Sequence, residues 1–116
     1  MRILIAEDDF ASRKFMLKFL SKFGECDITV DGMEAVDAYL MALDADTPYD
    51  LVCLDIMMPA LDGYQALKAI RDIEQERKIP EEIRIHPVTN ADLVSEIFLI
   101  CLIIREVNKQ VIKQIY

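Results

Sequence analysis

The stretch LVCLDIMMP, residues 51–59, decides the fold class of this chain. Its first four residues are apolar without interruption and Asp55 follows them, which is typical of a central strand in a parallel sheet that ends at a polar edge. The stretch ILIAEDD, residues 3–9, has the same form, because an apolar run ends there in three acids. Pro59 disfavours helix at the residue before it and Gly63 permits unusual backbone angles, so a loop is predicted after Asp55. Two buried strands that each end in carboxylates therefore frame the fold.

Helical and extended patterns alternate at short spacing over residues 1–89. Apolar residues at helical spacing predict three helices, and short apolar or alternating runs predict two further strands. Pro87 has no amide proton, so the last of these strands is expected at an edge of the sheet. Such alternation predicts an α/β fold, a doubly wound parallel sheet with helices on both faces. The predicted helices are residues 11–23, 33–43 and 64–76, and the two further strands are residues 26–30 and 83–89.

The chain after Thr89 departs from this pattern. The apolar run at residues 97–104 could form a fifth strand, but only seven residues separate it from Thr89. A crossover between parallel strands needs about a dozen residues. We therefore expect the fifth strand to be missing and one long helix to cover about residues 91–114, with acids early and bases late, as the helix dipole favours.

The expected C-terminal helix has a consequence for assembly. It would be apolar on every side between residues 97 and 104, and such a helix must be buried. Without a fifth strand, the same chain cannot bury it completely. We therefore expect a homodimer in which residues 90–116 of two subunits pack together or exchange by domain swapping. The alternative is an altered chain whose exposed apolar run drives nonspecific association.

The length of 116 residues implies a single domain, residues 1–116, with a core at 1–89 and an atypical segment at 90–116. An apolar fraction of 53% excludes disorder, and a net charge of −8 argues against nucleic-acid binding. No apolar run is long enough to cross a membrane and no secretory signal is apparent, so a cytoplasmic location is expected. The charge excess lies in residues 1–63, which hold 13 acids and 5 bases. This distribution indicates that a feature of residues 1–63 requires carboxylates.

If the strands that precede them are neighbours, Glu7, Asp8 and Asp55 converge at the carboxyl edge of the sheet. Like charges a few ångströms apart require either a cation or the protonation of some of them. Carboxylate oxygens and water are the ligands that Mg²⁺ prefers. A carboxylate beside such a metal could accept a phosphoryl group while the metal balances the charge. The alternative is a pair of solvated acidic loops.

These segments, together with Arg13 and the pair Asp62-Gly63, resemble the receiver domains of two-component response regulators over about residues 1–90. The resemblance, which is of the chemotaxis-regulator type, implies a flavodoxin-like receiver fold. It also implies a role in phosphorelay signal transduction, in which Asp55 accepts a phosphoryl group from a sensor histidine kinase in a Mg²⁺-dependent reaction.

The resemblance implies a role for each matching residue. Asp8 corresponds to the direct Mg²⁺ ligand, and Glu7 corresponds to the second acid, which acts through water. Met57 corresponds to the residue whose backbone carbonyl joins Asp55 in the coordination shell. Thr89 corresponds to the hydroxyl residue that bonds the phosphoryl oxygen and transmits the signal.

The sequence departs from the family pattern at several positions. Glu7 stands where the family usually has Asp, and Asp9 is interpreted as a loop residue instead of a ligand. The chain has no Gly after Gly63 and no Lys-Pro pair, so the lysine of the family's phosphorylation site cannot be assigned. Lys109 and Lys113 are the only lysines after residue 90.

Three functions are compatible with these observations. The first is a stand-alone phosphoacceptor receiver that is not an enzyme, has a histidine kinase as its partner and binds no nucleic acid or membrane. The second is a receiver-like dimeric interaction scaffold whose phosphorylation switch is impaired. The third is a phosphohydrolase with an aspartyl nucleophile, which would require a second acid two residues after Asp55. Met57 stands at that position, so this function ranks last.

Overall fold

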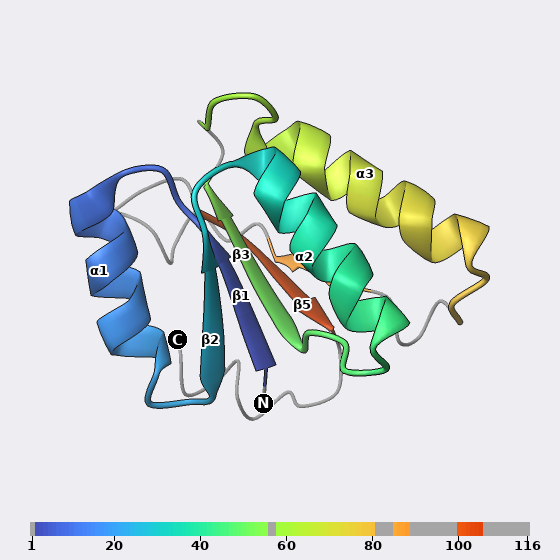
Figure 1. The fold of residues 1–116 in the computed structure, drawn as a ribbon, viewed down its shortest axis with the longest axis horizontal. Coiled ribbons are helices and arrows are strands. Elements are labelled where there is room, and N and C mark those ends of the chain that lie inside the picture. Colours follow the sequence, from blue (N-terminus) through green and yellow to red (C-terminus); the bar gives the residue numbers. More distant parts are fainter. Residues whose placement is uncertain (1, 56–57, 81–84, 89–99, 106–116) are drawn as a thin grey trace.

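The computed structural model describes residues 2–55, 58–80, 85–88 and 100–105 as strands, helices and the turns between them (Figure 1). The helices are α1 (Phe10–Leu20), α2 (Gly32–Asp44) and α3 (Gly63–Glu76). The strands are β1 (Arg2–Ala6), β2 (Glu25–Thr29), β3 (Leu51–Asp55), β4 (Ile85–Val88) and β5 (Ile100–Arg105). No helix in these four ranges has both the length and the apolar character that a membrane span needs.

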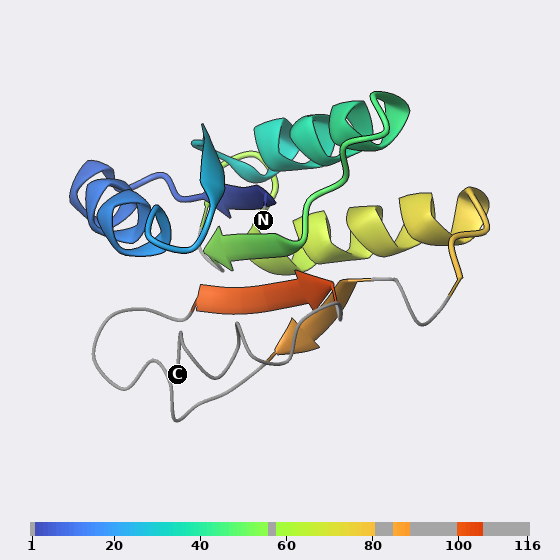
Figure 2. The ribbon, with the colours of Figure 1, turned by 90° about the horizontal axis from the view of Figure 1, so that it is seen from below.

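The strands form one sheet in the order β2-β1-β3-β5-β4. β1 lies between β2 and β3 and pairs with both in parallel. Figure 2 shows α1 on one side of this sheet and α2 and α3 on the other. The chain therefore has the expected α/β architecture, with three parallel strands covered on both faces.

Alternate side chains of β1 and β3 serve the two faces of the sheet, because neighbours along a strand point in opposite directions. This explains why residues 3–6 and 51–54 are continuously apolar: each of them is buried against one helix layer or the other. Between the sheet and the layer of α2 and α3, the buried residues include Leu4, Ala6, Ala35, Tyr39, Val52, Leu54, Ala66 and Ile70. On the α1 side they are Ile3, Ile5, Met16, Leu20, Leu51 and Cys53.

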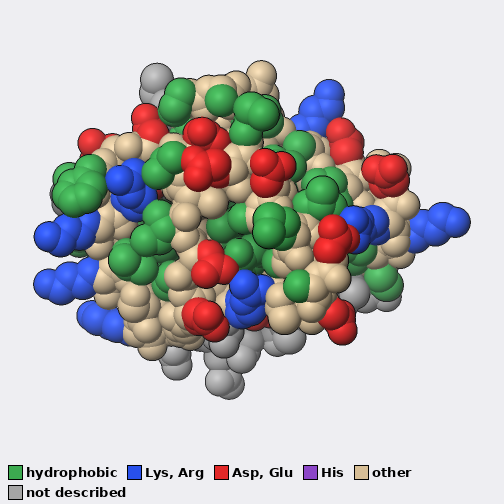
Figure 3. Space-filling view, in the orientation of Figure 1, with side chains coloured by type: hydrophobic (Ala, Val, Ile, Leu, Met, Phe, Trp, Pro, Cys, Tyr) green, Lys and Arg blue, Asp and Glu red, His purple; other side chains and the backbone are tan. Residues whose placement is uncertain are grey.

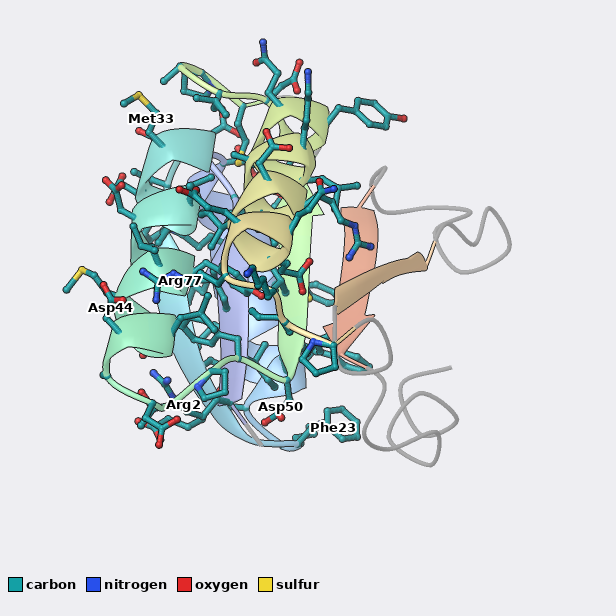
Figure 4. The ribbon with its side chains drawn as sticks, turned by 90° about the vertical axis from the view of Figure 1, so that its right-hand side faces the viewer. Arg2, Phe23, Met33, Asp44, Asp50 and Arg77 are labelled. Carbon is teal, nitrogen blue, oxygen red and sulfur yellow. The ribbon has the colours of Figure 1, made fainter. Side chains whose placement is uncertain are left out.

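Polar contacts join α2 to α3 above this core. The Tyr39 hydroxyl donates a hydrogen bond of 3.3 Å to the buried carboxylate of Glu74, which also accepts a bond of 3.0 Å from Arg71. Nearer the ends of the two helices, Arg77 forms an ion pair of 2.6 Å with Asp44 (Figure 4). The two helices are therefore fastened to each other as well as to the sheet.

The C-terminal part differs from the long helix that the sequence predicts. That prediction is wrong over residues 100–105, which form β5, so the fifth strand is present. β5 runs antiparallel to both β3 and β4 and lies between them. An antiparallel return needs no crossover, so the shortness of the connection, which excludes a parallel fifth strand, does not exclude this one. β4 is an edge strand, as Pro87 predicts.

The remaining parts of the predicted C-terminal helix lie outside the described residues, and the homodimer through residues 90–116 remains a prediction. One argument for this dimer no longer applies, however. The prediction rests on an apolar helix that the chain cannot bury, whereas residues 100–105 pair with strands on both sides.

Candidate metal and phosphoacceptor site

β1 and β3 end side by side, and this brings the predicted carboxylates together. Ala6 pairs with Leu54 in the parallel register, so the residues that follow lie at the same edge of the sheet. One carboxylate oxygen from each of Glu7, Asp8 and Asp55 lies within 4.8 Å of the others. The convergence that the sequence predicts is therefore present in the structure.

The three carboxylates differ in their exposure. Glu7 is buried, with 1% of its surface exposed, while Asp55 is partly buried and Asp8 is exposed. The pKa of Glu7 is raised to about 7: burial raises it most, a backbone hydrogen bond from Asp9 lowers it, and the neighbouring carboxyls of Asp55 and Asp8 raise it. In the absence of a cation, the cluster therefore tends to hold a proton.

The Glu7 carboxylate is only partly satisfied by hydrogen bonds. Its Oε1 accepts a bond of 3.1 Å from the backbone N–H of Asp9. Its Oε2 is buried, and no donor within the described ranges reaches it. A buried carboxylate oxygen without a hydrogen-bond donor destabilises the folded chain unless a positive charge compensates it. The donor set, three carboxylates beside the solvent, fits a hard divalent cation such as Mg²⁺.

Arg13 and Asp9 hold the loop that carries these acids. The guanidinium of Arg13 donates to the backbone carbonyls of Glu7 at 3.0 Å and Asp8 at 3.3 Å. Asp9 is the N-cap of α1, with its carboxylate accepting from the N–H of Ser12 at 2.9 Å, which also lowers its pKa. The interpretation of Asp9 as a loop residue agrees with this cap. The sequence singled out Arg13 but did not reveal that it supports the loop.

The loop after β3 contacts the start of α2. Asp31 caps α2, and Gly32 is the first residue of this helix. A Cβ atom at Gly32 would overlap with the carbonyl oxygen of Leu61 and lie 2.6 Å from its Cβ. Asp62 follows as the N-cap of α3, in a reciprocal capping box with Gln65. An Asp-Gly pair directly before a helical pattern is the signal that could have revealed this contact.

Two residues of the predicted site, Met57 and Thr89, lie outside the described residues, as do Lys109 and Lys113. The roles of Met57 and Thr89 therefore remain predictions, and so does the absence of the family's lysine. The structure unites three of the five predicted site residues.

Comparison with known proteins defines the class of this fold and site. The family model for the response regulator receiver domain matches residues 3–96, and the chain belongs to this family. The chain is 40% identical over 75 residues to hybrid signal transduction histidine kinase I of Dictyostelium discoideum. It is 35% identical over 77 residues to two-component response regulator 24 of Arabidopsis thaliana. These alignments cover 63% and 66% of the chain.

A solved structure supports the same assignment. The chain is similar to the receiver domain of the response regulator Ssk1 of Saccharomyces cerevisiae, in a co-crystal structure with the histidine phosphotransfer protein Ypd1. The TM-score is 0.57 and the identity 28%, over 67% of this chain and 51% of the other. The chain spans 4% of the length of the Dictyostelium kinase and 52% of the Arabidopsis regulator.

Proposed function

We propose that this receiver domain accepts a phosphoryl group on Asp55 from the phosphohistidine of a sensor histidine kinase or of a histidine phosphotransfer protein. The observation that carries the proposal is the convergence of Asp55 with Glu7 and Asp8 at the end of the parallel strands. The Ypd1–Ssk1 complex supports the choice of donor, because it pairs a similar receiver with a phosphotransfer protein.

In this reaction an oxygen of the Asp55 carboxylate attacks phosphorus while the phosphorus–nitrogen bond of the donor histidine breaks. The imidazole nitrogen keeps the bonding electron pair, and Asp55 becomes an acyl phosphate. Glu7 and Asp8 would hold Mg²⁺ together with Asp55 and, as the resemblance implies, the carbonyl of Met57. The metal, when bound, offsets the negative charge that accumulates on the phosphoryl oxygens and carboxylates.

We further propose that the domain is a phosphoacceptor and not an enzyme that turns over a free substrate, and that it works in the cytoplasm. The free thiols of Cys26 and Cys53 are compatible with a reducing compartment.

The test is incubation of the full chain with Mg²⁺ and acetyl phosphate, followed by intact-mass measurement. We expect one phosphoryl adduct on the wild type and none on Asp55→Asn. Asp31→Asn is a matched control, because it removes a carboxylate at the same edge of the sheet while Asn keeps the α2 cap. It should be labelled like the wild type. Equal labelling of Asp55→Asn would refute the proposal.

The place of β4 supports a second candidate, the interaction scaffold with an impaired switch. β5 separates β4 from β3, and two strand spacings of about 4.8 Å put these strands roughly 10 Å apart. Val88, the last residue of β4, is therefore separated from β3 and Asp55 by β5, and Thr89 is the next residue in the sequence. If the scaffold is correct, the wild type takes up no phosphoryl group under conditions in which it binds Mg²⁺, and Thr89→Ala changes nothing.

A further inference from the structure

The charges of this chain are divided between two neighbouring segments. Residues 10–24 hold four bases and no acid, while residues 25–50 hold eight acids and no base. All residues outside 25–50 together hold 13 acids and 13 bases, so the second segment accounts for the whole net charge of −8. In the structure the first segment is α1 with the turn after it, and the second runs from β2 through α2 to the start of β3.

The exposed side of α1 combines these bases with aromatic rings. Lys14, Lys18 and Lys22 follow one another at intervals of four residues and are exposed. Beside them, Phe15 is 53% exposed and Phe19 is 38% exposed. These five residues are here called the basic face. The helix uses Ser12, Met16 and Leu20, on its other side, to cover the sheet, so the aromatic residues of the basic face are not part of the core.

The exposed side of α2 combines acids with apolar side chains. Met33, Asp37 and Met41 are spaced by four residues along α2, and Figure 4 shows Met33 projecting away from the sheet. Met33 is 54% exposed and Met41 70%. These three residues and the exposed Glu34 are here called the acidic face. Figure 3 shows Lys and Arg side chains over α1 at the left, and acidic and hydrophobic side chains over the region of β2 and α2.

A cavity of about 350 Å³ opens beside Met41 of the acidic face. Arg2, the single cation among its lining residues, forms an ion pair of 2.9 Å with Asp27. Asp27 also accepts a hydrogen bond of 2.6 Å from the Tyr49 hydroxyl. The polar groups at this end of the cavity therefore satisfy one another. The space is at the lower end of the roughly 300–1,000 Å³ range of ligand pockets, which is enough for an aromatic side chain.

We propose that the basic face of one molecule binds the acidic face of a second copy of this chain. Lys14, Lys18 and Lys22 would lie against Glu34 and Asp37, with the Phe15 and Phe19 rings against Met33 and Met41 or in the cavity. A second copy is the occupant because the chain itself carries both complementary surfaces, while two acidic faces would repel each other. Contiguous exposed apolar groups among charges are typical of such contacts. The proposal is independent of phosphorylation.

This contact is weak and sensitive to salt. Exposed ion pairs contribute little individually, and charges further apart than roughly 10 Å are screened at about 0.1 M salt. We therefore expect sedimentation velocity of the full chain to show association that grows with protein concentration at about 20 mM NaCl and weakens at least tenfold at about 500 mM. A monomer at low salt and high concentration would overturn the proposal.

Charge reversal tests the pairing of the two faces directly. One variant carries Lys14→Glu and Lys18→Glu, and the other carries Glu34→Lys and Asp37→Lys. Each variant alone is expected to lose the association, because its two faces then repel. An equimolar mixture is expected to associate again, because the intact acidic face of the first variant meets the intact basic face of the second, and the two reversed faces are also complementary.

The matched control reverses two exposed charges on α3, with Lys68→Glu and Asp72→Lys, and should associate like the wild type. Circular dichroism confirms that each variant is folded. Association that survives in each single-face variant would overturn the proposal and favour a contact through residues 90–116. Failure of the mixture to recombine would also overturn it, and would favour a basic partner of another kind for the acidic face.

Discussion

Glu7 is the residue at which the fold and the proposed function are in tension. Its carboxylate is buried next to two other acids, and one of its oxygens has no donor among the described residues. Such a group destabilises the folded chain when it is ionised and no cation is bound. The proposed reaction needs the ionised form, because a protonated carboxyl is a poor ligand for Mg²⁺. Metal binding and folding should therefore be linked through this one side chain.

The linkage predicts a pH dependence. Because the pKa of Glu7 rises from an ordinary 4.5 to about 7 on folding, the folded chain binds a proton more tightly than the unfolded chain. The contribution of this group to stability is therefore full below pH 4.5 and is lost as the pH rises through about 7. The difference is worth at most roughly 3 kcal/mol in the free energy of unfolding. Mg²⁺ should restore stability at about pH 8 and have little effect at about pH 5.

Urea unfolding in EDTA and in Mg²⁺ at these two pH values measures the effect. The control is Glu7→Gln, which keeps the shape of the side chain without its charge. In EDTA at high pH this variant should be at least as stable as the wild type, and it should gain less from Mg²⁺. A wild type that becomes more stable as the pH rises from 5 to 8 in EDTA, relative to Glu7→Gln, would contradict the assignment of a raised pKa.

The three helices around the site each begin with an aspartate N-cap. Asp9, Asp31 and Asp62 each cap a helix that follows a parallel strand, so three acids of the first half are structural and not ligands. The caps bring the starts of α2 and α3 together, and Gly32 packs there against Leu61. Leu61, in the loop between β3 and α3, can therefore approach α2 closely because Gly32 has no side chain.

Gly32→Ala should consequently destabilise the protein, although Ala favours helix more than Gly. The added methyl group would meet a backbone carbonyl, which cannot turn aside as a side chain can. We expect a loss of about 1–3 kcal/mol in the free energy of unfolding and slower labelling by acetyl phosphate, since the loop after Asp55 must shift. Met33→Ala, at the next and exposed position, should stay within about 0.5 kcal/mol of the wild type. A stabilised Gly32→Ala would show that the contact does not exist.

The helices and strands that could be predicted from the sequence are those whose hydrophobic pattern fits only one type of secondary structure. The apolar runs of β1 and β3 end in acids, and the amphipathic spacing of α1, α2 and α3 fits no strand. The run at residues 97–104 has no such pattern, because a short apolar stretch suits a buried helix and a buried strand equally. The same distinction applies to the site. The convergence of Glu7, Asp8 and Asp55 could be predicted because it follows from the strand order. The burial of Glu7 and the contact at Gly32 could not be predicted, because they depend on tertiary packing that no local sequence pattern shows.

The sheet as a whole depends on β5, which joins β4 to β3. β3, which carries Asp55, pairs with β1 on one side and with β5 on the other. Without β5, the continuous apolar run of β3 would become an exposed edge, which favours aggregation. The short final strands therefore protect the strand that carries Asp55.

Leu102→Pro tests this arrangement. Leu102 lies in the middle of β5, opposite Cys53 of β3 and Val88 of β4, and Pro would remove a backbone donor from a strand that is paired on both sides. We expect a loss of roughly 3 kcal/mol or more in the free energy of unfolding, with aggregation visible in size-exclusion chromatography. Leu102→Val keeps the backbone donor and should cost less than about 1.5 kcal/mol. Equal stabilities of the two variants would mean that residues 100–105 do not pair with β3, and the edge of the sheet would then need another cover.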